Sequence, residues 1–511
     1  MSDQTLFPTP ARKALITISV MATTLIVTID MTITVVAVPH MQAGLAASPD
    51  QVIWVLTSYL IASAIMMPLS SWLASRFGRK RVMMLSAIGF TVASAACGIA
   101  SSVEFMVLAR LVQGICGAGM IPLGQATLLD INPPEKQPKA MAMAGLGAML
   151  GPLLGPTLGG WLTEDYSWRW VFLINIPIGL FAAFAVFTSH YEVKDKAIGK
   201  FDWIGFGALS LFVGGFQLMM DRGPSKDWFD SPEIWIECGI SLTALYLTVV
   251  HMLTKRDTFV RASLFTDRNF ALGCVVSAVI GIIVFASSPI LTMMGQGLLG
   301  YTPFQFGLLN MPRAIGTIVG LLFVSRLMTL IDARMLLAAG LGCSVVALYM
   351  FSQLSLATDT MPIMVAGALQ GISGGMLISP LTALAFSTLH SQFRNEAAAL
   401  FALTRNVGNA IGISAIQVVL VHQTAQVAAR LGEGLRPDNP TLQLARPDMD
   451  FDSAAALFKA SGEVTRQAMM VSTVDTFWMG CLVAFCTFPV IFMMRKQKLG
   501  VAAPAAADVG H

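Results

Sequence analysis

Apolar stretches of membrane-spanning length recur along the whole chain, and short polar segments separate them. An α-helix needs about 17–25 apolar residues to cross the hydrocarbon layer of a bilayer, and fourteen stretches meet this length. They fall at roughly 14–38, 52–73, 82–100, 104–128, 140–162, 169–189, 202–220, 234–253, 270–293, 304–327, 335–355, 361–385, 396–421 and 472–494. Strand-like alternation does not recur, which argues against a membrane β-barrel. The pattern predicts an all-α polytopic membrane protein with fourteen transmembrane helices.

Composition and charge agree with this class and add an orientation. The chain is 55% hydrophobic and only 12% charged, whereas a soluble domain carries about 25% charged residues. Most of its 32 Lys and Arg residues fall in alternate loops and tails, including Arg12, Lys13, Arg495 and Lys496. Because cytoplasmic loops are enriched in Lys and Arg, both termini are predicted to be cytoplasmic. The net charge of +3 reflects this topology and gives no reason to expect a nucleic-acid partner.

A weak internal repeat relates the two ends of the chain. The segment LVQGICGAGMIP (111–122) resembles ALQGISGGMLISP (368–380), with the Gln-Gly pairs 257 residues apart. Gly151 and Gly408 match at the same offset in the following spans. The repeat maps each of the first six spans onto the span eight places later. Parallel half-repeats of this kind occur in secondary transporters, which bind substrate between the halves near the bilayer midplane.

The repeat also predicts how the chain divides. The predicted parts are an N-terminal six-helix half (1–190), an inserted transmembrane helix pair (200–255), a C-terminal six-helix half (265–498) and a disordered cytoplasmic tail (499–511). The C-terminal half contains one long loop, 422–471, predicted to be periplasmic. Two interpretations of this loop remain open: a solvated loop, or a partner-docking element with a short amphipathic helix over 451–470.

Asp30 is the most informative single residue, because a carboxylate inside a membrane span is costly and is a functional candidate by default. At about 1.5 Å per residue, Asp30 lies roughly 12 Å from the outer end of its span, and Arg110 lies roughly 9 Å from the outer end of span 4. These similar depths allow the two side chains to pair. A paired Asp30 would stay ionised, and a separated, desolvated one would take up a proton. We therefore predict that Asp30 and Arg110 couple transport to protons. The alternative is a permanent buried ion pair that fixes packing.

A stripe of glycines interrupted by prolines marks the fifth span. Its members are Gly147, Gly151, Gly155 and Gly159, with Pro152 and Pro156 between them. Glycines spaced four residues apart share one helix face and permit close backbone approach. Prolines inside a helix add local bends. The segment is therefore predicted to be a hinge or a tight helix interface.

A basic hairpin follows the second span. It comprises Arg76, Gly78, Arg79, Lys80 and Arg81. It could be only a topology determinant. The glycine turn also suggests a tighter structure, in which arginines cap helix C-termini and form a cytoplasmic gate.

Five further polar side chains within spans are candidates to line a central cavity: Gln113, Arg313, Gln370, Arg405 and Asn406. For the two arginines, the alternative is a structural role at a helix end.

Motifs for enzymatic chemistry are missing from the sequence. It contains no GxxxxGK[ST] loop for ATP, no HExxH, no nucleophile elbow and no Cys/His cluster. All seven cysteines lie within predicted spans, so a metal site or a disulfide framework is not expected. The sequence therefore predicts a protein that is not an enzyme, uses no cofactor or metal, and draws energy from an ion or substrate gradient.

Seven segments together resemble one family. They are IDMTITVVAVP (29–39), SWLASRFGRKR (71–81), LARLVQG (108–114), GPLLGPTLGG (151–160), FDWIGFGALSLFVGGFQLMMDRG (201–223), GYTPFQFGLLNMPR (300–313) and TRNVGNAIG (404–412). They are similar to motifs of the major facilitator superfamily, specifically its fourteen-helix drug:proton antiporters of the EmrB/QacA type.

The resemblance implies roles for particular residues. Arg110 matches the helix-4 arginine implicated in proton coupling, and residues 151–160 match the antiporter motif. In the loop motif, Ser71 and Ser75 stand where the family has Gly and Asp. A gate based on that carboxylate must therefore differ here or be weaker.

The EmrB-like branch further implies a periplasmic membrane-fusion adaptor and an outer-membrane channel of the TolC type. The predicted function is a proton-coupled multidrug efflux antiporter in the bacterial inner membrane, which exports hydrophobic or amphipathic toxic compounds and contacts membrane lipids. Two alternatives remain: a specific metabolite, fatty-acid or siderophore exporter on the same fold, or a membrane receptor or scaffold that does not transport.

Overall fold

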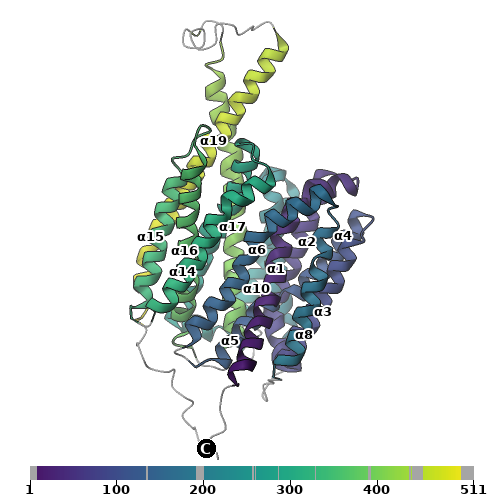
Figure 1. Cartoon of the computed structure of the whole chain (residues 1–511), viewed down its shortest axis with the longest axis vertical. Coiled ribbons are helices and arrows are strands. Elements are labelled where there is room, and N and C mark those ends of the chain that lie inside the picture. The colour runs from purple at the N-terminus through teal and green to yellow at the C-terminus, as the bar shows by residue number, and fades with distance from the viewer. Residues whose placement is uncertain are drawn as a thin grey trace, which may run out of the picture.

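A bundle of long helices makes up the structure, a computed structural model (Figure 1). The structure describes residues 8–133, 136–191, 201–255, 258, 261–285, 287–328, 330–389, 393–436, 439 and 453–496. Within these ranges no residue is in a β-strand. The tail predicted at 499–511 lies outside the described residues.

Six long helical segments form the first part of the bundle. They are α1 (Pro10–Gly44), α2 (Pro49–Phe77), α3 (Arg79–Gly98), α4 (Val103–Gly117) continued by α5 (Met120–Ile131), α6 (Gln137–Asp165), and α7 (Trp170–Leu173) continued by α8 (Asn175–Ser189). Helix α1 is central to this half, because it contacts α6, α8 and α5.

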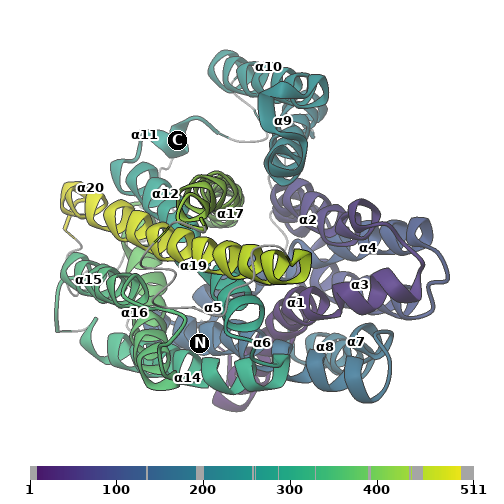
Figure 2. The same ribbon diagram turned by 90° about the horizontal axis from the view of Figure 1, so that it is seen from above.

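Two helices of the inserted pair stand at the side of the bundle. They are α9 (Trp203–Arg222) and α10 (Pro232–Thr254), joined by the short 3-10 helices η2 (Gly223–Lys226) and η3 (Trp228–Asp230). Polar contacts hold them together at both ends: an ion pair of Arg222 with Glu237 at 2.6 Å, and a hydrogen bond of 2.7 Å between His251 and Asp202. Seen from above, the pair lies outside the two halves, and α9 contacts both α2 and α17 (Figure 2).

The remaining helices form the second half. They are α11 (Ser263–Thr266), α12 (Arg268–Ile280), η4 (Gly281–Phe285), α13 (Ser287–Thr292), η5 (Met293–Leu298), α14 (Pro303–Leu327), α15 (Ala333–Phe351), α16 (Thr360–Phe386), α17 (Arg394–Gly432), α19 (Ala454–Cys486) and α20 (Phe488–Met493). The segments η4 and η5 are π-helical turns within the ninth span.

Similar starts mark helices that are equivalent in the repeat. Helix α2 begins with a capping box between Ser48 and Gln51, and α14 begins with one between Thr302 and Gln305. In both helices a proline follows the cap, where its missing N–H costs nothing. The sequence thus specifies the start of these two spans locally, before any tertiary contact forms.

The predicted all-α fold is confirmed, and thirteen described helices are long and apolar enough to span a bilayer. Helix α6 is the one predicted span outside that count. It is 29 residues long and packs between α1 of the first half and α14 of the second. Between the halves, α2 also packs against α17.

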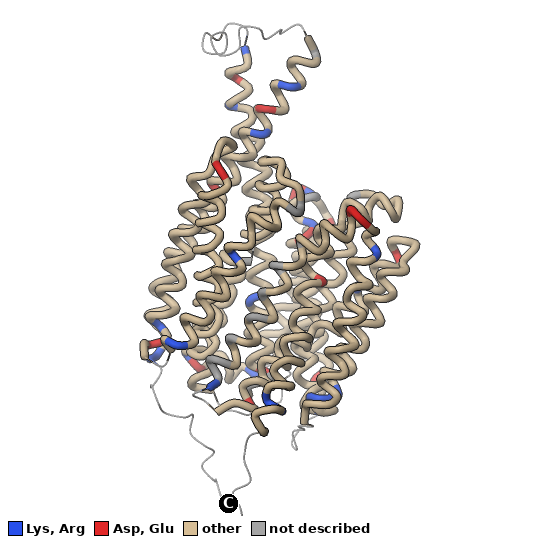
Figure 3. Tube along the Cα trace, viewed as in Figure 1, with Lys and Arg blue, Asp and Glu red and all other residues tan. Residues whose placement is uncertain are grey.

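The long loop predicted at 422–471 is largely helical where the structure describes it. Helix α17 continues to Gly432 and α19 begins at Ala454, so the two helices project from the bundle as a hairpin (Figure 1). Charged residues lie along this hairpin and near both ends of the bundle, and fewer occur between (Figure 3). The polar composition of these segments therefore marks helices outside the apolar layer.

Candidate functional site

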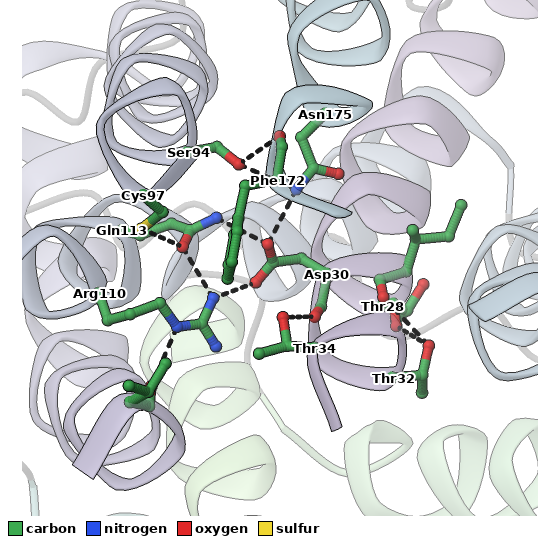
Figure 4. Close-up of polar contacts among 12 residues, drawn as sticks. Thr28, Asp30, Thr32, Thr34, Ser94, Cys97, Arg110, Gln113, Phe172 and Asn175 are labelled. Atoms are coloured by element: carbon green, nitrogen blue, oxygen red, sulfur yellow. Dashed lines mark hydrogen bonds and ion pairs between the residues drawn. The ribbon is translucent and has the colours of Figure 1, made fainter. Parts of the chain in front are cut away.

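A buried ion pair lies inside the first half. Asp30 of α1 is 0% exposed, and Arg110 of α4 is 1% exposed. The Arg110 Nη1 donates to Asp30 Oδ2 at 2.6 Å (Figure 4). The two residues that the sequence placed at similar depths therefore contact each other directly.

Two amides donate to the other oxygen of the same carboxylate. Gln113 Nε2 and Asn175 Nδ2 each lie 2.8 Å from Asp30 Oδ1. Gln113 also accepts from Arg110 Nη1 at 2.8 Å, so it bridges both members of the ion pair. Ser94 of α3 accepts from Asn175 at 3.0 Å and fixes the orientation of that amide. These donors stabilise the negative charge of Asp30.

Aromatic and backbone groups hold the arginine. The Arg110 Nε donates to the Val55 carbonyl of α2 at 3.0 Å. The guanidinium carbon lies 4.3 Å from the ring centroid of Tyr59 and 5.7 Å from that of Phe172, within the range of cation–π attraction. Arg110 therefore has contacts to α2 that do not depend on Asp30.

Chemically, this cluster is a buried carboxylate with three donors around it. The residues of the cluster come from α1, α2, α3, α4 and α8, so a relative motion of these helices would change these contacts.

Sequence analysis missed Asn175 and Ser94. The only available signal for Asn175 was a polar side chain inside the apolar stretch 169–189. Its partner could not be inferred, because Asn175 is 145 residues from Asp30 and only the packing of α8 against α1 brings them together.

The glycine stripe of α6 faces α1. A Cβ on Gly147 would lie 2.9 Å from the Met21 carbonyl oxygen, and one on Gly159 would lie 3.0 Å from Ile33. A Cβ on Gly151 would collide with Thr28.

The close approach of α6 to α1 continues past Gly151. The Thr32 hydroxyl donates across the interface to the Gly151 carbonyl at 3.0 Å, and Gly155 lies against Thr32. Pro152 and Pro156 lie in the same unbroken helix. The stripe thus forms a tight interface with the part of α1 that carries Asp30.

The basic hairpin contains one ordered ion pair. Gly78 adopts φ of +100°, a turn that favours glycine, and Arg79 follows it in a buried position. The Arg79 Nη1 lies 2.6 Å from Asp130 at the end of α5. Arg76 and Arg81 have exposed side chains. Lys80 lies 5.2 Å from the ring centroid of Phe187.

The carboxylate of this ion pair is Asp130, which belongs to the same half as Arg79. Sequence analysis missed Asp130, because it lies just outside the predicted span 104–128 and nothing in the sequence relates it to Arg79.

The five cavity candidates lie in three places. Gln113 belongs to the Asp30 cluster. Arg313 and Gln370 lie within the second half, where Arg313 donates to the Val284 carbonyl at 3.2 Å and Gln370 to the Ser287 hydroxyl at 2.8 Å. Asn406 contacts Met67 of α2 across the two halves at 3.9 Å, and Arg405 precedes it in α17. In the described part of the chain, no group of three or more His, Cys, Asp or Glu side chains is arranged to hold a metal.

These observations define a multi-pass membrane protein with two related six-helix halves, and the comparisons identify its class. Residues 20–413 match the profile of the Major Facilitator Superfamily, so the chain belongs to this family of membrane transporters, which are not enzymes. It belongs to the EmrB/QacA-like branch of the family. The resemblance stated from the sequence is confirmed at this level.

Relatives of similar length cover nearly the whole chain. The chain is 31% identical to the multidrug export protein EmrB of Escherichia coli strain K12 over 480 residues, 92% of this chain and 93% of the relative. It is 29% identical to the fatty acid resistance protein FarB of Neisseria gonorrhoeae over 491 residues, 95% of this chain and 96% of the relative. It is 27% identical to the colistin resistance protein EmrB of Acinetobacter baumannii over 481 residues, 92% and 94% of the two chains.

Solved structures agree in fold. A bacterial homolog of the human lysosomal transporter Spinster matches with a TM-score of 0.57 at 17% identity, covering 95% of this chain and 98% of that one. The proton:xylose symporter XylE matches with a TM-score of 0.57 at 13% identity, covering 93% and 95%. At these identities the likeness concerns the fold alone.

Proposed function

We propose that this transporter is a proton-coupled exporter of hydrophobic or amphipathic toxic compounds in the bacterial inner membrane. The observation that carries the proposal is the buried Asp30–Arg110 pair with the two amides that complete it. A carboxylate that can be either paired and ionised or unpaired and protonated is the element that a proton-driven cycle requires.

The two states of Asp30 would be linked to the position of α1. In the paired state, α4 and α8 hold the carboxylate through Arg110 and Asn175. Proton uptake removes the charge that these donors stabilise, and α1 is then free to shift against them. On proton release the charge returns and the pair forms again. Protonation and deprotonation of Asp30 would therefore alternate with two arrangements of these helices.

Alternating access would carry this local change to the substrate. Helix α6 connects α1 to α14 of the second half, so a shift of α1 is transmitted through the glycine stripe to the interface between halves. The Arg79–Asp130 pair, together with Arg76, Gly78, Lys80 and Arg81, would brace the cytoplasmic gate. Substrate would bind between the halves and leave on the opposite side.

The substrate class is proposed from the relatives. Their names describe export of multiple drugs, resistance to fatty acids and resistance to colistin, which share an amphipathic or apolar character. A narrower candidate, a dedicated exporter of one fatty-acid or metabolite class, is favoured by the similarity to FarB.

Competition tests separate the broad exporter from the narrow one. In proteoliposomes with an imposed pH gradient, proton movement would be followed while amphipathic compounds of unrelated structure are added. A broad exporter responds to several of them, and they compete with one another. A response to one chemical class alone supports the dedicated exporter. No substrate-dependent proton movement with any compound contradicts proton-coupled export.

The proposed protein partners depend on which side of the membrane the α17–α19 hairpin lies. We place both termini in the cytoplasm and the α17–α19 hairpin in the periplasm, where it would meet a membrane-fusion adaptor that connects to a TolC-type outer-membrane channel. A variant whose residues 428–458 are replaced by a short Gly-Ser linker tests this placement. It is expected to retain antiport in proteoliposomes and to lose resistance in cells. Full resistance in cells would contradict the docking role.

A further inference from the structure

The repeat places a counterpart of the Asp30 cluster in the second half. At the offset of 257 residues, Ser287 stands at the position of Asp30 and Gln370 at that of Gln113. The structure makes the same contact in both halves, because Gln113 donates to Asp30 at 2.8 Å and Gln370 donates to Ser287 at 2.8 Å. The amide of the Asp30 cluster is thus repeated in the second half, where a hydroxyl stands in place of the carboxylate.

The counterpart of Arg110 in the second half is an arginine that comes from a different helix. At the same offset from Arg110 lies Gly367 of α16. Arg313 of α14 packs against it: a Cβ on Gly367 would lie 3.7 Å from the Arg313 Cβ. The Arg313 Nη2 donates to the Val284 carbonyl at 3.2 Å, and the Ser287 hydroxyl donates to that same carbonyl at 2.9 Å. Arg313, Ser287 and Gln370 therefore form one connected network, which we call the second polar site.

Charge distinguishes the two sites. Asp30 neutralises Arg110, whereas no carboxylate lies within ion-pair distance of Arg313 among the residues that the structure describes. Its bond to Val284 uses one of five N–H donors, and the side chain is only part-buried. An uncompensated cation inside a membrane span is expensive, and it persists where a function requires it. The second polar site is therefore short of one anion.

The same site also contains a buried amide oxygen that has no hydrogen-bond partner. Gln370 is 1% exposed, and its Oε1 has no hydrogen-bond partner in the described structure. The equivalent oxygen of Gln113 accepts from Arg110. The second polar site thus lacks partners for both the cation and the amide, as expected of a site that a ligand completes.

An apolar cavity begins at the same serine. It has a volume of about 110 Å³, and its walls come from η4, α13, α15, α17 and α19. Ser287 lines it together with Ile283, Ile290, Ile416, Phe477 and Val483. Arg313 does not line the cavity itself, but it shares the Val284 carbonyl with Ser287, which does. A cation next to the polar edge of an apolar cavity matches a molecule with an anionic head and an apolar tail.

We propose that the second polar site binds the anionic head of an amphipathic substrate, with Arg313 as its charge partner and the cavity beside Ser287 as the place of its tail. The class of ligand is a carboxylate attached to an acyl or aryl chain. This inference rests on the proposed function only in treating that ligand as cargo. The binding site itself does not depend on how transport is driven.

Equilibrium binding tests the site without any gradient. Radiolabelled decanoate would be titrated onto the full-length protein in lipid nanodiscs, with empty nanodiscs subtracted, beside decyltrimethylammonium of the same chain length. Arg313→Gln removes a charge-assisted contact, so decanoate binding is expected to weaken about tenfold or more, and Arg313→Lys retains part of it. Ser287→Asp supplies the missing carboxylate within the protein and is expected to displace decanoate similarly. Arg430→Gln, which removes an exposed cation from the hairpin, serves as the matched control.

The two ligands separate charge recognition from packing. The proposal requires that Arg313→Gln and Ser287→Asp weaken decanoate binding, and that decyltrimethylammonium, whose head is cationic, binds the unmodified protein more weakly than decanoate does. It is overturned if the unmodified protein shows no saturable decanoate binding, if Arg313→Gln binds decanoate as well as the unmodified protein, or if decyltrimethylammonium binds the unmodified protein as tightly as decanoate. Decanoate binding without proton-coupled export would contradict the proposed function and leave this site standing.

Discussion

A single carboxylate organises the polar interior of the first half. Asp30 accepts hydrogen bonds from Arg110, Gln113 and Asn175, which come from two other helices. The sequence was sufficient to predict Asp30 and Arg110, because charged residues in apolar stretches are rare and their depths can be counted. It was not sufficient for Asn175 or Asp130. The role of a polar residue depends on the residues that it contacts. The partners of Asn175 and Asp130 are more than fifty residues away along the chain.

Asn175 tests how tightly the ionised carboxylate is held. Asn175→Ala removes one hydrogen bond to a charged group, a contribution of about 1.5–3 kcal/mol. The paired state should become less favourable, so protons should cross more easily without substrate. We expect a faster proton leak in proteoliposomes under an imposed pH gradient. Thr188→Ala, at the far end of the same helix, should leave the leak unchanged. A leak equal in both variants would argue that Asn175 does not hold the carboxylate.

His190 gives a pH-dependent contribution to stability. It lies just beyond α8, is 3% exposed, and shares a hydrogen bond of 2.7 Å with Ser19. Burial, and then the charges of Arg79, Lys80 and Arg12, lower the pKa of His190 to about 4. In the unfolded chain the pKa is about 6.5. The unfolded state therefore binds more protons between these values, and stability is lost as pH falls from about 6.5 towards 4.

His190→Gln tests this linkage, since Gln can keep a hydrogen bond but does not titrate. The melting temperature of the protein in detergent would be measured between pH 7.5 and pH 5. The unmodified protein should lose stability over this range by about 1.4 kcal/mol per pH unit below the unfolded pKa. The variant should lose less. Parallel pH dependence in both proteins would show that another group is responsible.

Among the elements, the α1–α6 interface leaves little room for added volume. The sequence predicted a hinge or a tight interface from the spacing of the glycines. The structure has a tight interface, because these glycines lie against the backbone and side chains of α1. Which helix they would face could not be read from the sequence, since a stripe of small residues does not identify its partner.

Gly151→Ala tests the need for this close approach. The added methyl group collides with Thr28, and overpacking of this kind costs about 1–3 kcal/mol. We expect a lower melting temperature and reduced transport at normal membrane insertion. Gly207→Ala is the matched control, because no atom lies within 4 Å of a Cβ at Gly207 of α9. Equal effects of the two substitutions would contradict a specific role for the interface.

The α17–α19 hairpin shows where a hydropathy pattern stops being informative. Beyond Val421 the chain becomes polar, so the sequence predicted a loop, yet α17 continues to Gly432. Helix formation does not require an apolar face on every turn once the helix has left the apolar layer. The composition therefore did not predict the end of the helix, which lies at Gly432.

At the scale of the whole molecule, the internal repeat predicted a relation between two halves in addition to the helical fold. Hydropathy alone was enough for an all-α membrane bundle, and the repeated Gln-Gly pairs indicated two related halves. The structure adds that the halves differ in charge: the first half has a complete ion pair, and the second has an arginine whose carboxylate is absent among the described residues. Two repeated positions carry the difference: Asp30 corresponds to Ser287, and Arg110 corresponds to Gly367, against which Arg313 of another helix packs.

The central claim is that Asp30 couples substrate export to proton movement. The most direct measurement follows internal pH in proteoliposomes while an amphipathic compound is added, for the unmodified protein, Asp30→Asn and Asp359→Asn. Asp359 is an exposed carboxylate before α16 and serves as the control. We predict substrate-dependent proton movement in the unmodified protein and in Asp359→Asn, and none in Asp30→Asn. Proton movement at an undiminished rate in Asp30→Asn would contradict the account.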